Sequence, residues 1–275
     1  MTQNENRARA TSPLTQLFFA RGRALLMPYA VGGYPDIESC SKILRAYREA
    51  GADLIEIGIP FSDPLADGPV IQSASTLALS RGVRPGNVLD LAAEAASDGA
   101  RVVLLSYLNT ILAFGPVCFF ARCKECGVLG VVVPDLPVEE AAELQAVARD
   151  SSVDVILLAA PTSTDARLAR IAAAASGFIY CVSTTGVTGA RAALRADLPA
   201  FIARVRQHTD LPLALGFGVS TIDQVTTVAG EADGVIIGSA LVDIVAKSSD
   251  LDTALAEVKS YLMAAKVAVE ASPKR

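Results

Sequence analysis

The chain has 275 residues, of which 52% are hydrophobic and 19% are charged, and its net charge is -5. This composition predicts a large buried core, and the length suits either one α/β barrel or two small domains. The negative charge and the scattered basic residues exclude a nucleic-acid surface, and no apolar run reaches the roughly 20 residues that span a bilayer. We therefore expect a cytoplasmic protein that binds neither nucleic acid nor membrane.

Short apolar runs alternate with amphipathic segments along the whole chain. The runs predict strands at Leu25–Val31, Leu54–Gly58, Val102–Ser106, Leu129–Val133, Val155–Ala159, Phe178–Ser183, Leu213–Gly216 and Gly234–Ile237. The amphipathic segments predict helices at Ile37–Ala50, Pro69–Gly82, Asn87–Gly99, Val138–Asp150, Asp165–Ala175, Thr221–Ala229 and Leu251–Ala271. Asp36 and Thr164 precede two of these helices and are residue types that cap helix N-termini.

This alternation indicates the fold class. Eight βα units without a break in composition predict a single α/β domain over residues 1–275, a closed (β/α)8 TIM barrel. We expect extra helices at the N-terminus and in the βα loops, a mobile start over residues 1–14, and a frayed tail over residues 266–275. In such barrels the active site lies at the C-terminal ends of the strands.

Glu56 is a carboxylate within the otherwise apolar strand LIEIGIP. Alternation places it on the same face as Leu54 and Gly58, which we interpret as the barrel interior. A buried carboxylate without a partner is costly unless its pKa rises, and a purely structural strand would have Val or Ile there. The position predicts a functional role for Glu56.

The loop that follows this strand, PFSDPLADGP, holds Asp63 and Asp67 between prolines and a glycine. Asp in such loops often serves only the turn. From position alone, Asp67 is as good a catalytic candidate as a turn residue, and Asp63, which precedes Pro64, is the weaker candidate.

Glycines gather at the ends of the last three predicted strands. They are Gly186 and Gly189 in STTGVTG, Gly216 and Gly218 in GFGVS, and Gly238 beside Ser239. Late strand ends in these barrels bind phosphate through backbone N–H groups and the N-terminus of a short extra helix. Three clusters at consecutive strand ends predict a phosphate site.

Several chemistries lack the residues that they need. The six lysines fall in helical segments or the tail, so a strand-end Schiff-base lysine is not predicted. The one histidine, His208, ends the helix before strand seven, away from the active end. Five cysteines form no disulfide framework, and Cys123-x-x-Cys126 has no second pair with which to hold a metal. We expect no metal site, and carboxylate acid–base chemistry on a small phosphorylated substrate.

The stretch LIEIGIPFSDPLADGPVIQ resembles the signature of the tryptophan synthase alpha subunit family nearly residue for residue. The resemblance extends over roughly residues 15 to 265, through MPYAVGGYPD, SYLNTILAFG, VVVPDLPVEE, STTGVTGAR, LALGFGVST and GVIIGSALV. It implies cleavage of indole-3-glycerol phosphate to indole and glyceraldehyde 3-phosphate. It also implies a pyridoxal-phosphate-dependent beta subunit as partner in an α2β2 assembly, with no cofactor in this chain.

The resemblance assigns roles by position. Glu56 and Asp67 match the catalytic carboxylates. The matching substrate-binding positions are Tyr29, Tyr180, Gly189, Phe217, Gly218, Gly238 and Ser239. Tyr29 stands where the family commonly has phenylalanine beside the indole ring. Pro60–Gly68 matches the loop that faces the beta subunit, and Thr184–Leu198 matches a mobile lid.

The sequence departs from the family at two places. Asn109-Thr110 replaces a common Asn-Pro, which bears on the subunit contact, and Thr184-Thr185 replaces an Arg-Ser of the lid. Three alternatives remain at this point: an isomerase of histidine or tryptophan biosynthesis, an inactive subunit that only activates a partner, and a free-standing lyase that releases indole. The missing strand-end lysine argues against the isomerase, and the presence of both carboxylates argues against the inactive subunit.

Overall fold

The computed structural model describes residues 12–182, 197–216 and 218–272. Its strands are β1 (Leu25–Val31), β2 (Ile55–Gly58), β3 (Val102–Leu105), β4 (Val128–Val132), β5 (Asp154–Ala159), β6 (Ile179–Val182), β7 (Leu213–Gly216) and β8 (Gly234–Ile237). They form a closed barrel in which each strand pairs in parallel with its sequence neighbours and β8 pairs with β1. The predicted fold class, a (β/α)8 barrel, is confirmed, and each predicted strand end lies within one residue of the observed end.

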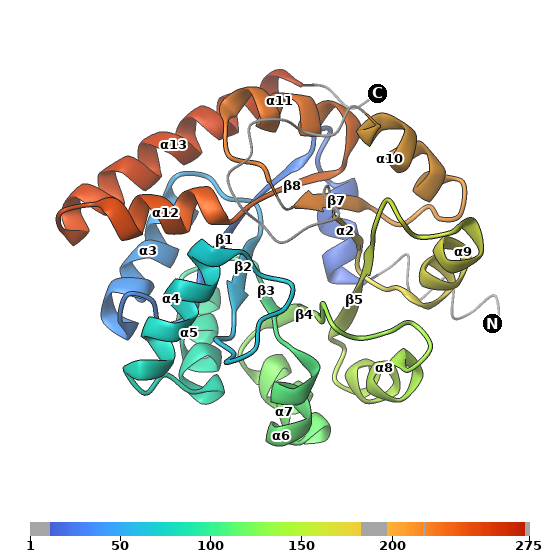
Figure 1. The fold of residues 1–275 in the computed structure, drawn as a ribbon, viewed down its shortest axis with the longest axis horizontal. Helices are drawn as coiled ribbons and strands as arrows, with labels where there is room; N and C mark the ends of the chain where they lie inside the picture. Colours follow the sequence, from blue (N-terminus) through green and yellow to red (C-terminus); the bar gives the residue numbers. More distant parts are fainter. Residues whose placement is uncertain (1–11, 183–196, 217, 273–275) are drawn as a thin grey trace.

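The helices surround the strands (Figure 1). They are α2 (Pro13–Phe19), α3 (Ile37–Glu49), α4 (Pro69–Ser80), α5 (Pro85–Ser97), α6 (Leu108–Phe114), α7 (Pro116–Glu125), α8 (Ala141–Asp150), α9 (Asp165–Ala174), α10 (Leu198–Arg206), α11 (Ile222–Glu231), α12 (Ser239–Lys247) and α13 (Leu251–Ala271). Asp36 and Thr164 cap α3 and α9 by accepting backbone N–H groups, as predicted. None of these helices is long and apolar enough to cross a membrane.

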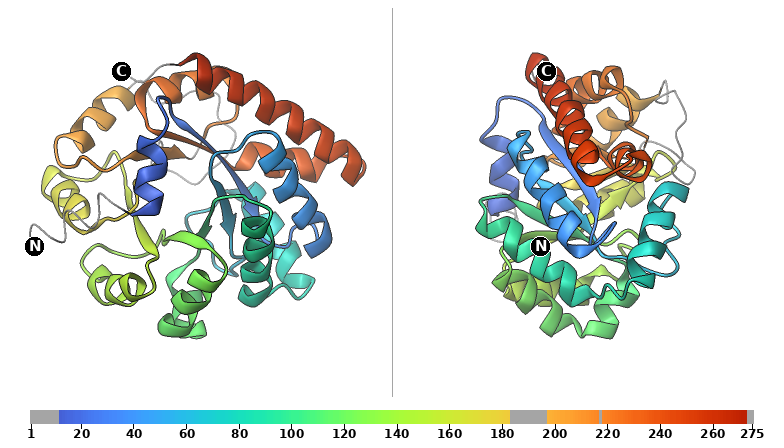
Figure 2. Two further views of the ribbon diagram at one scale, coloured as in Figure 1. Left: turned by 180° about the vertical axis from the view of Figure 1, so that it is seen from behind. Right: turned by 90° about the vertical axis from the view of Figure 1, so that its left-hand side faces the viewer.

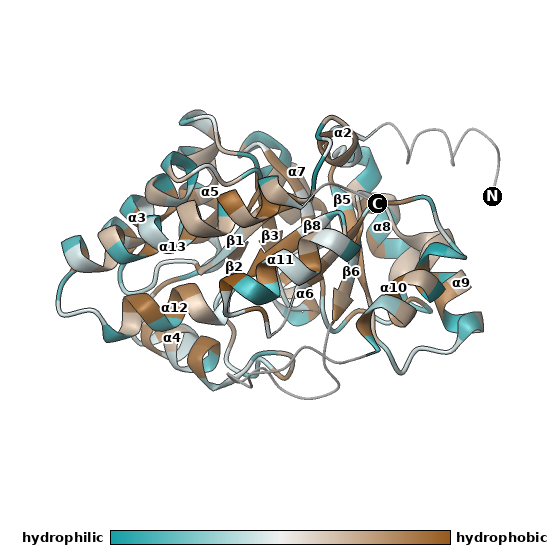
Figure 3. Cartoon of the chain, turned by 90° about the horizontal axis from the view of Figure 1, so that it is seen from above, coloured by the Kyte–Doolittle hydropathy of each residue, from teal (hydrophilic) through white to brown (hydrophobic). Residues whose placement is uncertain are grey.

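The core fills the barrel and the space between strands and helices. The residues of β1, β2, β3, β7 and β8 are buried throughout, because parallel strands have a packed face on both sides. Figure 3 shows mainly apolar strands at the centre and, around them, helices that carry both hydrophilic and hydrophobic segments.

The N-terminal end of the barrel is covered by α2 (Figure 2, left). Leu14 and Phe18 are fully buried, Phe18 packs on Phe178 with ring centroids 5.3 Å apart, and the Thr15 hydroxyl donates to the Gly177 carbonyl at 2.8 Å. Access to the barrel interior is therefore left to the opposite end, where the βα loops lie.

Two expected boundaries differ from the structure. The start that we expected to be mobile includes Pro13 and Leu14, which belong to α2. The tail that we expected to fray from residue 266 continues as helix to Ala271, because Lys266 pairs with the buried Asp53 and Val269 is fully buried. The end of α13, from Lys266 to Ala271, is thus held by tertiary contacts to the barrel.

Candidate active site

Glu56 lies in the middle of β2, beside Tyr29 of β1 and Val103 of β3. It is only 1% exposed, and neither carboxyl oxygen has a hydrogen-bond partner in the part of the chain that the structure describes. Burial and, second to it, the negative charge of Asp67 together raise the pKa of Glu56 to about 8. Glu56 is therefore mostly protonated at neutral pH and can donate a proton.

Asp67 lies in the loop between β2 and α4, immediately before Gly68, the N-cap of α4. It is 5% exposed. Burial raises the pKa of Asp67 to about 6, while a hydrogen bond from the Tyr107 hydroxyl at 3.1 Å acts in the opposite direction. Asp67 is therefore mostly ionised at neutral pH. The pKa of Glu56 lies above that of Asp67 because Glu56 is more deeply buried and faces the charge of Asp67, whereas Asp67 accepts the Tyr107 hydrogen bond.

Tyr29 of β1 and Tyr180 of β6 have matching surroundings in the barrel. A Cβ built on Gly58 would overlap the Tyr29 hydroxyl, and a Cβ built on Gly216 would overlap the Tyr180 hydroxyl. Each glycine thus makes room for a tyrosine of the neighbouring strand to lie across it. The carboxylates Glu56 and Asp67 both raise the pKa of both tyrosines, after burial, so the four side chains lie within electrostatic range.

The late-strand glycines share a cavity with these side chains. The cavity is lined by Tyr29, Asp67, Ile71, Leu105, Tyr180, Gly218, Val219, Ile236, Gly238 and Ser239. Gly238 is the N-cap of α12, and its Cβ position lies 3.5 Å from the Tyr29 ring. The structure therefore brings the helix start predicted to hold phosphate next to the aromatic residue predicted to contact the substrate.

Three sequence predictions lie wholly or largely outside the described residues: Gly189, Phe217 and the Thr184–Leu198 lid. Asp63 is exposed, and its side chain accepts a hydrogen bond from the neighbouring Ser62 hydroxyl, as in an ordinary turn.

Tyr107 belongs to the site and was missed at the sequence level. It lies two residues after the end of β3, is 3% exposed, and donates a hydrogen bond from its hydroxyl to Asp67. Its segment, SYLNTILAFG, contributes to the family resemblance, which assigned no role to Tyr107 itself. The available signal was its position, because a tyrosine directly after a barrel strand points a polar group toward the active end.

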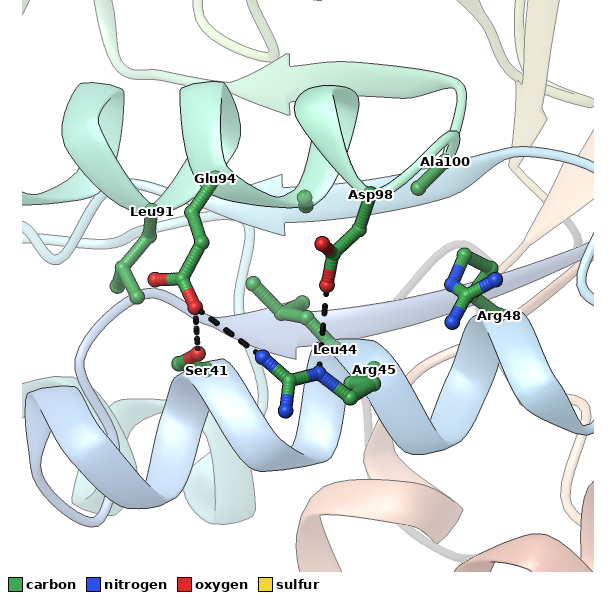
Figure 4. Close-up of a pocket in the computed structure, with 9 residues that line it drawn as sticks. Ser41, Leu44, Arg45, Arg48, Leu91, Glu94, Asp98 and Ala100 are labelled. Atoms are coloured by element: carbon green, nitrogen blue, oxygen red, sulfur yellow. Dashed lines mark hydrogen bonds and ion pairs between the residues drawn. The ribbon is translucent and has the colours of Figure 1, made fainter.

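Metal ligands do not gather in the described residues, where no group of three or more His, Cys, Asp or Glu side chains could hold an ion. Another hollow, between α3 and α5, is polar, but its charges neutralise one another (Figure 4). There Arg45 pairs with Asp98 at 3.3 Å and with Glu94 at 3.6 Å, and Glu94 accepts from the Ser41 hydroxyl. This hollow has the character of a helix–helix contact.

The fold and the site define a (β/α)8-barrel enzyme with a pair of buried carboxyl groups, one within β2 and one in the loop that follows it. The sequence profile of the family described as "Tryptophan synthase alpha chain" matches residues 16–270. The chain belongs to this family.

Individual relatives agree with the family match. A tryptophan synthase alpha chain from Roseiflexus castenholzii is 48% identical over 231 residues, covering 83% of this chain and 88% of the relative. One from Lacticaseibacillus casei is 43% identical over 261 residues, covering 94% and 96%.

Solved structures give the same result. A Mycobacterium tuberculosis tryptophan synthase chain superposes with a TM-score of 0.87 at 36% identity, covering 94% of this chain and 98% of that chain. A chain of a Pyrococcus furiosus tryptophan synthase complex gives 0.81 at 33% identity, covering 90% and 99%. The family's reaction is the cleavage of indole-3-glycerol phosphate, so this chain is a carbon–carbon lyase of tryptophan biosynthesis.

Proposed function

We propose that Glu56 and Asp67 together carry out the retro-aldol cleavage of indole-3-glycerol phosphate to indole and glyceraldehyde 3-phosphate. The observation that carries this proposal is the difference between the two buried carboxyl groups: one has a pKa of about 8 and the other of about 6. Between these values one group holds a proton and the other a negative charge, which is the pairing that acid–base catalysis requires.

The reaction follows from these charge states. Protonated Glu56 donates its proton to C3 of the indole ring, and the ring nitrogen takes on positive charge. Ionised Asp67 accepts a hydrogen bond from the ring N–H and stabilises that charge. The side-chain hydroxyl then returns a proton to Glu56 as the C–C bond breaks, the bonding electrons flow into the ring, and an aldehyde forms. Glu56 ends the cycle protonated, as it began.

The phosphate of the substrate is assigned to the backbone N–H groups around Gly218, Gly238 and Ser239. Gly238 precedes α12, and the first N–H groups of a helix are free to bind an anion. Tyr29 and Tyr180 line the same cavity, where they would contact the indole and glycerol parts of the substrate. Binding the phosphate there would hold the scissile bond over the carboxyl groups and contribute by positioning.

The proposed partner is a tryptophan synthase beta subunit in an α2β2 assembly, located in the cytoplasm, with pyridoxal phosphate bound by that subunit and not by this chain. The similarity to a chain of the Pyrococcus furiosus tryptophan synthase complex supports the partner. The exposed Leu65, 86% accessible at the tip of the loop that carries Asp67, offers an apolar contact for it.

The test is indole release from indole-3-glycerol phosphate by wild-type chain, Glu56→Gln and Asp67→Asn. We expect Glu56→Gln to lower kcat by about 10²- to 10⁴-fold, the usual size of acid–base effects, and Asp67→Asn to lower it as well. The kcat/KM profile of the wild type should be bell-shaped, with limbs near the pKa values of Asp67 and Glu56. A Glu56→Gln variant that keeps more than about a tenth of wild-type kcat would rule out the assignment.

The same assay, repeated with a saturating beta subunit, distinguishes a chain that works as a subunit of a complex from a lyase that works alone. Since a displacement near 1 Å can change rates by ~10²-fold, docking on the loop of Asp67 should activate the chain at least about tenfold. Equal turnover with and without the beta subunit would favour the free-standing lyase.

A further inference from the structure

Tyr107 makes two hydrogen bonds through one hydroxyl group. It donates to Asp67 Oδ2 at 3.1 Å, and it accepts from the Ala66 N–H, also at 3.1 Å. The second bond fixes the direction of the first, because a hydroxyl whose oxygen already accepts an N–H has its proton directed elsewhere. Asp67 Oδ2 is thereby occupied, while Oδ1 accepts no hydrogen bond from the residues that the structure describes and is left for a ligand.

The ring of Tyr107 holds the other end of the same loop. It stacks on Phe61 with ring centroids 5.0 Å apart and an interplanar angle of 24°. The loop between β2 and α4 therefore touches Tyr107 twice, through Phe61 near its start and through Ala66 and Asp67 near its end. One side chain thus spans the loop that presents the carboxylate.

Tyr107 is itself firmly placed. It is the N-cap residue of α6, and its carbonyl accepts from the Ser106 hydroxyl at 3.3 Å. The next residue, Leu108, donates its N–H to Asp135 in the loop after β4 at 2.9 Å. The backbone on both sides of Tyr107 is thus held at the ends of β3 and β4. The loop between β2 and α4, which contacts Tyr107, is therefore held in place relative to these strands.

We propose that Tyr107 is a positioning residue: it holds Asp67 by Oδ2, so that Oδ1 faces the indole N–H of the substrate. This inference rests on the proposed role of Asp67. It adds that the carboxylate is oriented from β3, a different strand from the one that carries its loop. The hydrogen bond also favours the ionised form of Asp67, because a donor stabilises a carboxylate more than a carboxylic acid.

The test variant is Tyr107→Phe, which keeps the ring on Phe61 and removes only the hydroxyl. The matched control is Tyr261→Phe on α13, since the Tyr261 hydroxyl is buried without a partner in the described residues. Two quantities are measured: the pH profile of kcat/KM, and the titration of the Asp67 carboxyl carbon by NMR without substrate.

We expect Tyr107→Phe to raise the pKa of Asp67, so the acidic limb of kcat/KM moves to higher pH. At pH 6 to 7 the loss of a hydrogen bond to a charged group should lower kcat/KM at least about tenfold. Tyr261→Phe should match the wild type in both measurements. A Tyr107→Phe variant with an unchanged kcat/KM profile would overturn the positioning role.

The NMR titration keeps this test separate from the proposed function. An unchanged Asp67 titration in Tyr107→Phe would overturn the hydrogen bond, and with it the inference, whatever the activity. An active Asp67→Asn variant would instead remove the role of Asp67 while leaving the titration shift in place. The two failures therefore have different signatures.

Discussion

The two ends of the barrel treat buried carboxylates in opposite ways. Of the acidic side chains that the structure describes, four are buried: Asp53 and Asp233 at the N-terminal ends of the strands, and Glu56 and Asp67 at or beyond β2 near the cavity. Asp53 precedes β2 and receives hydrogen bonds from Arg23 at 2.7 and 2.9 Å and from the Leu26 N–H at 2.9 Å.

Asp233 repeats this arrangement before β8. It pairs with Arg206 at 2.6 Å and accepts the Leu213 N–H of β7 at 2.9 Å. In both places an aspartate at the start of one strand binds the backbone of the preceding strand in the barrel, and an arginine neutralises it.

Among the residues that the structure describes, the active end has no such cations within reach of its carboxylates. Neither Glu56 nor Asp67 has an ion pair among the described residues, and burial leaves the pKa of each raised. At Asp53 burial would also raise the pKa, but the hydrogen bonds and the charges of Arg23 and Lys266 bring it below its usual value. A buried carboxyl group therefore stabilises the fold at the N-terminal end of the barrel, where cations neutralise it. At the active end the same kind of group is available for chemistry, and its burial costs stability.

Of the carboxylate substitutions at the two ends of the barrel, the one at Asp53 should lower the free energy of unfolding most. We expect Asp53→Ala to lower the free energy of unfolding by about 3–5 kcal/mol, because it removes the carboxylate that neutralises the largely buried Arg23 and leaves Lys266 with only the exposed Glu270. Glu56→Gln, as the matched change at the active end, should cost little or be stabilising. Urea denaturation of both variants measures the difference. Equal losses would show that the two ends do not differ in this way.

The pH dependence of stability should have opposite signs at the two ends. Glu56 has a folded pKa above its unfolded value, so ionising it costs stability as pH rises from about 5 to about 8. Glu56→Gln should therefore gain on the wild type over this interval, by roughly a few kcal/mol at most.

Asp53 has a folded pKa below its unfolded value, so its contribution is present above the unfolded pKa and is lost as pH falls. Unfolding midpoints measured from pH 3 to pH 8 for wild type, Glu56→Gln and Asp53→Ala test both signs. A pH-independent difference between wild type and Glu56→Gln would contradict the raised pKa of Glu56, and one between wild type and Asp53→Ala would contradict the lowered pKa of Asp53.

The smallest effect on stability is expected from substituting the arginines that pair with Asp53 and Asp233 at the N-terminal end of the barrel. The Arg206 side chain is 41% exposed, whereas that of Arg23 is 13% exposed. Solvent screens the more exposed pair, so Arg206→Met should cost about 1 kcal/mol or less, and Arg23→Met should cost more. Thermal unfolding of the two variants ranks them, and the reverse order would mean that exposure does not govern these pairs.

Sequence patterns predicted the features that depend on residues close together in the chain. The strands could be placed because a parallel barrel buries both faces of each, and Glu56 stood out because a carboxylate interrupts such a run. Asp67 could only be ranked as an even candidate, since a turn explains it equally well until the family signature is considered.

The remaining features depend on distances that the sequence does not contain. The bond from Tyr107 to Asp67 joins residues 40 apart, and its existence depends on the path of one loop. Gly51–Asp53 could be predicted as punctuation between a helix and a strand, but not as an ion-pair site, because Arg23 lies 30 residues away and Lys266 lies 213 residues away. Such contacts follow from barrel closure and from no local pattern.

The ion pair between Lys266 and Asp53 has a consequence for how the chain matures on the ribosome. Synthesis runs from the N-terminus, so Asp53 emerges long before Lys266, and β1 emerges long before β8, its partner through Leu25 and Gly234. A nascent chain that ends before β8 would present one edge of β1 unpaired, open to other strands. The barrel can therefore close only late in translation. The ion pair of Lys266 on α13, 3.4 Å from Asp53 Oδ1, forms later still.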